Sequence, residues 1–345
     1  MGLVLAIVAA LWGIGAAVKV PVRQRALITG FIWAAVVLMQ LVLPAGHALR
    51  QATGGSAQVW LVLGGVVMLV LAYAALLRRL RHRASPAAVS APKGAFVAGE
   101  LARYSRHIML REIGGPGQRR LKAARVLVIG AGGLGSPALL YLAASGVGCI
   151  GVIDDDVVDS SNLQRQIIHT DQRIGMDKVQ SAAVAMRALN PFIEVCPYQQ
   201  RLTPEIADSL FADYDLILDG SDNFDTRYLA NAVAVRLGKP LIAAAITQWE
   251  GQISLYDPAQ GGPCYECVFP NRPAPGMVPT CAEAGVASPL PGVIGTMMAL
   301  EAVKYLTEAG TGLRGRLMIF DGLYGESRVI GVKRRQGCRV CGARS

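Results

Sequence analysis

A glycine-rich turn between two apolar segments is the first feature of the chain that could carry chemistry. Gly130, Gly132 and Gly135 have G-x-G-x-x-G spacing at the end of RVLVIGAGGLG, residues 125–135. Asp154, in CIGVIDDD, follows nineteen residues after Gly135. Glycines allow a tight turn and close approach of the backbone to phosphate, and an acid after the second strand suits a ribose hydroxyl. Alone, this pattern predicts a nucleotide site whose default ligand is NAD.

Three polar residues just downstream favour a different ligand. Asn162 and Arg165 lie in SSNLQRQIIH, and Lys178 ends GMDK. A dinucleotide site needs few cations, because its pyrophosphate does not leave. Arginine and lysine aimed at this pocket suit a triphosphate whose terminal phosphates depart as pyrophosphate. An NAD-dependent oxidoreductase is therefore an alternative that rests on the glycine spacing alone.

Acidic residues follow two of the expected strands. Asp222 lies in SDN after the apolar segment YDLILDG, and Asp154 and Asp156 lie after CIGVI. At the carboxyl edge of an α/β sheet, a carboxylate can hold Mg²⁺ against phosphates or orient the attacking group. Asp222 could equally be the N-cap of the next helix. Of Asp154 and Asp156, we expect one to face the nucleotide and the other to be solvated.

Two CxxC pairs predict a tetrahedral zinc site. Cys264 and Cys267 form the first pair, Cys338 and Cys341 the second, with 70 residues between the pairs. Each pair supplies two thiolates on a tight turn, and four-sulfur coordination is typical of structural zinc. Such a metal would tie the middle of the body to its C-terminus. A redox role is the alternative, but neither pair opens a helix after a strand, as redox pairs do.

The other cysteines and two histidines give weaker signals. Cys281 lies alone in the loop TCAEAGV and could be a nucleophile or an ordinary loop thiol. Cys149 and Cys196 lie in apolar strands and are expected in the core. His107 and His169 have no metal-ligand spacing, so we assign neither a catalytic role.

Alternating strands and helices must position these residues. The alternation predicts an α/β fold with a Rossmann-like, doubly wound, mostly parallel sheet, which antiparallel strands and a zinc knuckle extend. A helix at residues 100–114 precedes the sheet and carries Arg103 and Arg106 on one face. Three expected strands run into their turn or polar ends within residues 125–135, 149–156 and 214–223, and the others lie near residues 193–200, 239–246, 251–257, 316–322 and 327–334.

The N-terminal part of the chain differs in composition from the rest. Residues 1–99 contain no Asp or Glu, and residues 1–83 carry eight of the 34 basic residues, so they hold +8 of the +10 net charge. Mean hydropathy is +0.39. Apolar runs at about residues 2–18, 26–43 and 57–77 approach the length that spans a bilayer. The charge is therefore a membrane signal, and the body lacks the basic stripe expected of a nucleic-acid-binding protein.

These features predict three segments of the chain. Residues 1–83 would be a membrane anchor with three transmembrane helices, residues 84–99 a Pro/Ala/Gly-rich linker, and residues 100–345 the catalytic domain. The basic loops predict a multi-pass protein of the inner (cytoplasmic) membrane with its domain facing the cytoplasm. Seven cysteines on that side argue for metal binding or catalysis rather than disulfides.

The order of the motifs resembles a known family. RYSR, GAGGLG, DDD, SNLQRQ, SDN, CYEC, TCAEAGV and GCRVC follow one another as in the bacterial E1-like adenylyltransferases of the MoeB/ThiF/HesA family, over about residues 100–342. The resemblance implies ATP- and Mg²⁺-dependent adenylation of the C-terminal glycine of a ubiquitin-like sulfur-carrier protein ending in Gly-Gly, with release of pyrophosphate. TQWEGQISLY and TCAEAGVASPLPGVIG are closer to the molybdopterin-synthase branch (MoeB) than to the thiamine branch (ThiF). The membrane anchor has no counterpart in soluble members.

The resemblance also implies roles for individual residues. Gly132 and Gly133 would cradle phosphate, Asp154 would bind the ribose, and Asp222 would be the magnesium-linked catalytic acid. Contacts to the triphosphate would come from Asn162, Arg165 and Lys178.

Partners follow from the same resemblance. Arg106 matches an arginine that reaches the partner subunit's ATP site, which implies a homodimer. Cys281 matches a loop cysteine that some members link covalently to the carrier. No rhodanese-like segment follows Cys341, so a separate sulfur donor, a sulfurtransferase or cysteine desulfurase, is expected. A non-catalytic membrane scaffold is the third class of function.

Overall fold

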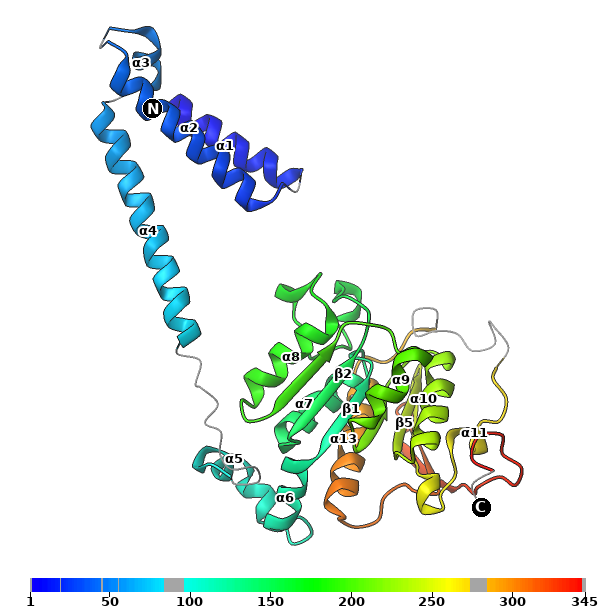
Figure 1. Cartoon of the computed structure of the whole chain (residues 1–345). Coiled ribbons are helices and arrows are strands. Elements are labelled where there is room, and N and C mark those ends of the chain that lie inside the picture. Colours follow the sequence, from blue (N-terminus) through cyan, green and yellow to red (C-terminus); the bar gives the residue numbers. More distant parts are fainter. Residues whose placement is uncertain are drawn as a thin grey trace. The chain divides into compact units, whose positions relative to one another are not determined.

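The chain forms two units, Met1–Ser90 and Ala91–Ser345, and each is described by itself. The computed structural model (Figure 1) describes residues 2–18, 20–44, 46–54, 56–83, 96–273 and 284–342. Most of the expected linker, residues 84–95, and Cys281 therefore lie outside the described residues. Residues 98 and 99, expected in the linker, belong to the first helix of the second unit.

The first unit is helical and exposes many large apolar side chains. Its described helices are α1 (Gly2–Ala17), α2 (Val22–Val42), α3 (Ala48–Thr53) and α4 (Ala57–Arg83). Exposed apolar side chains include Leu27, Phe31 and Leu38 of α2.

Of the three expected transmembrane helices, the described residues support one. The stretch Gln24–Val42 of α2 is long and apolar enough to cross a bilayer. With 16 described residues, α1 is about 24 Å long, short of the hydrocarbon core of about 30 Å. Ala57–Val70, at the start of α4, is a shorter apolar stretch, and α4 itself continues to Arg83.

An eight-stranded sheet forms the centre of the second unit. Its order is β3-β2-β1-β4-β5-β6-β7-β8. The first five strands in that order are parallel, and the pairs β5–β6, β6–β7 and β7–β8 are antiparallel. The predicted parallel sheet with an antiparallel extension is confirmed. The strands are β1 (Arg125–Ile129), β2 (Cys149–Ile153), β3 (Glu194–Tyr198), β4 (Leu216–Asp219), β5 (Leu241–Thr247), β6 (Glu250–Tyr256), β7 (Arg316–Asp321) and β8 (Glu326–Gly331).

Helices cover both faces of this sheet (Figure 1), because successive residues of its strands point to opposite sides. Val126 and Val128 of β1 join one core with α7 (Gly135–Ser145), α8 (Lys178–Leu189) and α13 (Leu290–Thr307). Leu127 and Ile129 join the other core with α9 (Pro204–Ala212) and α10 (Phe224–Leu237). The central strands are buried on both faces, which explains why they are continuous apolar runs.

The connections reverse direction between β1 and β4. From β1 the chain passes through α7 and α8 to β2 and β3, and it then returns through α9 to β4 on the other side of β1. Ligands of doubly wound sheets bind at this switch point, beyond the carboxyl ends of the strands. Two helices precede the sheet: α5 (Ala98–Ile108), which was predicted, and α6 (Gly114–Ala123), which was not.

Candidate nucleotide site and cysteine cluster

The turn after β1 has a backbone that requires glycine. Gly130 has φ +90°, a conformation that side chains disfavour. A Cβ on Gly135 would lie 1.9 Å from the carbonyl oxygen of Gly130, so α7 can begin here only without a side chain. Leu134, which precedes α7, provides no side-chain cap. The N-terminal N–H groups of α7 therefore suit an anion.

The acid after β2 closes this turn. The carboxylate of Asp154 accepts hydrogen bonds from the backbone N–H of Ala131, at 2.8 Å, and of Asp156, at 2.9 Å. Burial raises the pKa of Asp154, whereas these hydrogen bonds and the charge of Lys178 lower it. Asp156 is exposed and pairs with the buried ammonium of Lys178 at 2.7 Å. The two acids therefore divide as expected, since Asp154 faces the glycine turn and Asp156 faces solvent.

The SNLQRQ segment lies against the same turn. A Cβ on Gly132 would be 3.6 Å from Nε2 of Gln166, and one on Gly133 would be 3.8 Å from Cγ of Arg165. The guanidinium of Arg165 donates to Oδ1 of Asn162 at 2.7 Å. Residues that are thirty positions apart in the sequence thus meet at one edge of the sheet.

Asp222 lies at the end of β4, beside β1. Asn223, and not Asp222, is the N-cap of α10, because its Oδ1 accepts the N–H of Thr226 at 2.9 Å. The side chain of Asp222 is exposed, and it makes no hydrogen bond or ion pair within the described part of the chain. Its carboxylate is therefore available to a cation or a substrate. The backbone N of the preceding Ser221 lies 3.7 Å from where a Cβ on Gly130 would stand.

Among the described residues, Arg106 is the predicted site residue that is not brought to this edge. Cys281 lies outside the described residues. Arg106 is exposed on α5, which packs at the opposite edge of the sheet: the hydroxyl of Tyr104 accepts from Asn190, the C-cap of α8, at 2.7 Å. A five-residue strand spans roughly 16 Å, which is longer than an arginine side chain. Arg106 therefore does not reach the glycine turn of its own chain.

His169 is a residue of this edge whose contribution the sequence did not reveal. Its imidazole is buried, with Nε2 lying 2.9 Å from the carbonyl oxygen of Ala131 and Nδ1 lying 2.9 Å from Oγ of Ser181. Burial lowers its pKa. His169 joins the glycine turn to α8 and does not face the open side of the site. The one sequence signal that could have indicated this structural role of His169 is its position at the end of the motif SNLQRQIIH.

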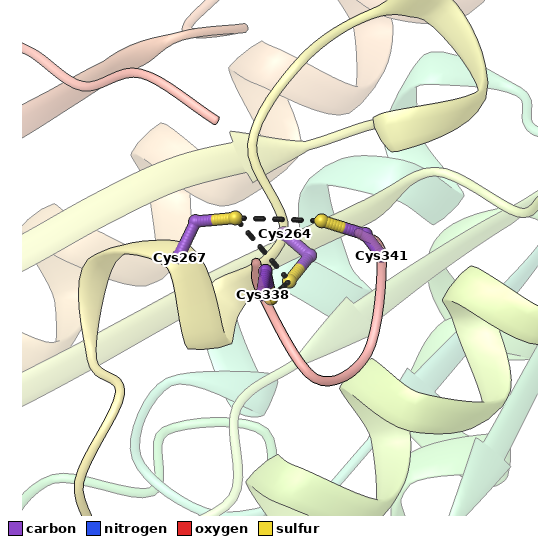
Figure 2. Close-up of side chains that lie close together, drawn as sticks. All are labelled: Cys264, Cys267, Cys338 and Cys341. Atoms are coloured by element: carbon purple, nitrogen blue, oxygen red, sulfur yellow. Dashed lines mark hydrogen bonds between the residues drawn. The ribbon is translucent and has the colours of Figure 1, made fainter. Parts of the chain in front are cut away.

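The four cysteines of the two CxxC pairs lie close together in the second unit, as the sequence predicted (Figure 2). Sγ–Sγ distances are 3.8 Å for Cys264–Cys267, 3.6 Å for Cys264–Cys338 and 3.4 Å for Cys267–Cys341. Tetrahedral zinc with Zn–S bonds of about 2.3 Å requires sulfurs about 3.8 Å apart, so the cluster fits this metal after a small expansion. Burial opposes ionisation of Cys338, but N–H groups of Cys341 and Val340 lower its pKa to about 7.

A second group of ligand atoms is less suited to a metal. Cys149, Glu194 and Cys196 place one ligand atom each within 4.8 Å of one another on β2 and β3. Burial and the neighbouring thiol raise the pKa of Cys149 to about 12, and Glu194 is exposed. Cys149 belongs to the core, and Cys196 packs against it, as predicted.

The sequence profile of the ThiF family matches residues 104–340. The chain belongs to the ThiF family. Within this family, it is 48% identical to the "Sulfur carrier protein adenylyltransferase" of Thermus thermophilus, over 70% of this chain and 91% of that protein. It is 50% identical to the "Probable adenylyltransferase/sulfurtransferase MoeZ" of Mycobacterium tuberculosis, over 70% of this chain and only 63% of that one.

A solved structure with the same fold supports the architecture of this ThiF-family chain. The crystal structure of E. coli MccB with MccA-N7isoASN superposes with a TM-score of 0.63 at 23% identity, over 70% of this chain and 74% of that one. At this identity the likeness concerns the fold alone. The Rossmann-like architecture predicted from the sequence is therefore present in a solved structure.

The cysteine cluster makes a prediction about stability. Cys264→Ser removes one of four thiolates, so bound zinc should fall from one equivalent to a small fraction and the melting temperature should drop by several degrees. Metal analysis and thermal unfolding of the same sample measure both. Cys196→Ser is the control, since it removes a thiol outside the cluster. Normal zinc content in Cys264→Ser would contradict the assignment.

Proposed function

We propose that this chain is an ATP-dependent adenylyltransferase that activates the C-terminal glycine of a ubiquitin-like sulfur carrier and releases pyrophosphate. The observation that carries the proposal is the meeting of a cation-bearing segment with the glycine turn: Cγ of Arg165 lies 3.8 Å from where a Cβ on Gly133 would stand, and the ammonium of Lys178 pairs with Asp156, two residues after Asp154. Membership of the ThiF family supports it, as does the similarity to a protein named sulfur carrier protein adenylyltransferase.

The chemistry explains why cations are needed. A carboxylate must attack the α-phosphorus of ATP in line with the leaving pyrophosphate, so negative charges crowd together. Asn162 and Arg165 would contact the triphosphate, and the N–H groups at the start of α7 would bind its oxygens. Lys178, now paired with Asp156, would exchange that exposed carboxylate for phosphate. An NAD-dependent oxidoreductase would have no use for these cations.

Magnesium fits the edge beside β1. The exposed carboxylate of Asp222 is the hard oxygen ligand that Mg²⁺ prefers, and Mg²⁺ would supply charge neutralisation to the triphosphate. Asp222 would hold the cation and orient the phosphates. Zinc, in contrast, would be structural, because its four thiolates leave no open position.

The MoeB-like segments TQWEGQISLY and TCAEAGVASPLPGVIG favour a carrier of molybdopterin cofactor biosynthesis over a carrier of the thiamine pathway. MoeZ is named as both an adenylyltransferase and a sulfurtransferase, and the chain matches 63% of its length. We propose a separate sulfurtransferase or cysteine desulfurase as the sulfur donor. Cys281 would be the residue to form any covalent link to the carrier, and the Cys281→Ser variant, assayed for transfer after adenylation, tests that role.

A homodimer is supported by the place of Arg106. An exposed arginine at the amino edge of the sheet can contribute to the site only from a second copy. Mixed dimers test this: Arg106→Ala and Asp222→Asn chains, each inactive alone, should recover activity when combined. No recovery from confirmed mixed dimers would remove Arg106 from the site.

Attachment to the inner membrane is supported by the N-terminal unit. Its helix α2 exposes apolar side chains along a segment of 19 residues, and residues 1–83 carry basic but no acidic residues. The basic run at residues 78–83 precedes the body in the sequence. Because basic residues that flank membrane spans lie mainly on the cytoplasmic side, this run favours a cytoplasmic body. The protein should stay with membranes after a carbonate wash and be released by detergent; release by carbonate alone would contradict attachment.

Exchange of radiolabelled pyrophosphate into ATP tests the proposed activity. Detergent-solubilised protein with a carrier ending in Gly-Gly should catalyse exchange, because adenylation is reversible. Asp222→Asn should reduce the rate by at least about a hundredfold while zinc content and unfolding remain normal. Asp225→Asn, an exposed acid three residues away, is the matched control.

Three outcomes distinguish the alternatives. Carrier-dependent exchange that Asp222→Asn loses supports adenylation. Retained exchange in Asp222→Asn contradicts the role of that residue. No exchange from folded, zinc-loaded protein with any carrier favours a scaffold, and binding of NADH would favour an oxidoreductase.

A further inference from the structure

Helix α10 connects the loop that carries Asp222 to the cysteine cluster. Three residues at four-residue intervals, Arg227, Asn231 and Val235, lie on one stripe of this helix. All three are buried. Arg227 contacts the loop before α10, whereas Asn231 and Val235 contact the cysteine pairs. The stripe therefore links two regions that are far apart in the sequence.

At its N-terminal end, α10 holds the residue that precedes Asp222. The guanidinium of Arg227 donates to the carbonyl oxygen of Ser221 at 2.6 Å and to that of Ala244, in the middle of β5, at 2.7 Å. The N–H and the hydroxyl of Ser221 both donate to Oδ1 of Asp219, at 2.9 and 2.6 Å. Ser221 is thus held by its N–H, its side chain and its carbonyl group.

Towards its C-terminal end, the same stripe contacts the first CxxC pair. Oδ1 of Asn231 accepts the backbone N–H of Tyr265, which lies between Cys264 and Cys267, at 2.8 Å. Val235 packs in one cluster with Cys264, Cys338 and Cys341.

The ring of Tyr265 provides a second contact with α10, because its neighbour Tyr228 belongs to that helix. The ring of Tyr265 is enclosed by Tyr228 and Tyr256, with centroids at 5.4 and 5.6 Å.

We infer that Arg227 is a positioning residue through which the zinc knuckle at Cys264–Cys267 sets the place of the Asp222 carboxylate. The inference rests on the proposed function, because Asp222 must act in the reaction for its position to affect the rate. Zinc fixes the turn that carries Tyr265, Tyr265 and Asn231 fix α10 and its guanidinium, and the guanidinium fixes Ser221. A metal bound by the two CxxC pairs would therefore also support the edge of the sheet that carries Asp222.

The geometry of arginine is essential to this role. A planar guanidinium can donate to two carbonyl groups in fixed directions, whereas a lysine ammonium is a point charge on a flexible stem. Arg227→Lys keeps the charge but cannot hold both partners in place. A displacement of about 1 Å at a reacting group can reduce a rate a hundredfold.

Steady-state pyrophosphate exchange by the full chain provides the first readout. Arg227→Lys should lower kcat tenfold to a hundredfold, with KM for ATP changed less than about twofold. Asn231→Leu, which removes the acceptor of the Tyr265 N–H, should retain zinc and lower kcat by a smaller factor. Arg236→Lys is the matched control on the same helix, because its exposed side chain pairs with Asp208 at the surface, and its kcat should match the wild type.

Hydrogen exchange of the backbone provides a readout that does not depend on activity. Peptides that cover residues 219–223 should exchange faster in Arg227→Lys, and also in wild-type protein from which zinc has been removed. Peptides that cover residues 154–159, after β2, should be unchanged, which separates local release from general unfolding. Arg236→Lys should match the wild type in both regions.

The outcomes separate this inference from the proposed function. If wild-type protein lacks exchange activity, the proposed function fails, and hydrogen exchange alone decides whether zinc holds the 219–223 loop. If wild-type protein is active but Arg227→Lys and Asn231→Leu keep wild-type kcat, the positioning role is overturned. Loss of zinc without faster exchange at residues 219–223 would also overturn it. If Arg227→Lys fails to fold, Asn231→Leu and zinc removal give the decision.

Discussion

The contact between the carbonyl group of Gly130 and the start of α7 is the constraint on which the proposed site depends. Because a Cβ on Gly135 would lie 1.9 Å from that oxygen, the helix can approach the turn this closely only with glycine there. The approach directs the N-terminal end of α7 to the carboxyl edge of β1. Asp154 and His169 then hold the intervening Ala131 by its N–H and carbonyl groups. A backbone fixed in this way can bind phosphate without reorganising, which is what electrostatic catalysis requires.

The two halves of the sheet serve different purposes. The parallel strands bring the glycine turn, the two acids after β2 and the Asp222 loop to one edge, since parallel strands end together. The antiparallel strands β6, β7 and β8 extend the sheet, and the cysteine pairs lie in the segments that follow β6 and β8. Helix α10 lies between these regions, because it begins next to Asp222 and ends beside the cysteines. The cysteine cluster and the glycine turn are therefore parts of one packed unit.

Much of this arrangement could be predicted from the sequence, because its signals are local. Apolar runs bounded by turn residues located all eight strands, and the spacing of the two CxxC pairs predicted a cluster that the structure brings together. Helix α6 was missed because Gly114, Gly115 and Pro116 in its first turn are typical of a loop. Of the three apolar runs, the described residues support one as a membrane span, because a hydropathy run alone does not require a helix of sufficient length: α1 has 16 described residues.

The remaining features depend on partners that a sequence does not display. Asp222 and Asn223 are equally good N-caps, and only the backbone shows that Asn223 takes that position. The partners of Arg227 and His169 include backbone carbonyl groups, which every residue possesses, so no pattern of residue types indicates them. Arg106 could be placed on a helix face, but its distance from the glycine turn required the fold.

Intact mass spectrometry of the carrier is the most direct test of the central claim. The purified chain, ATP and Mg²⁺ are mixed with a carrier ending in Gly-Gly and quenched in acid, and pyrophosphate is measured in parallel. The account predicts a carrier heavier by one adenylyl group, formed together with pyrophosphate, and no such species when the terminal glycine is deleted. An unchanged carrier, with ATP converted to ADP and phosphate, would contradict it.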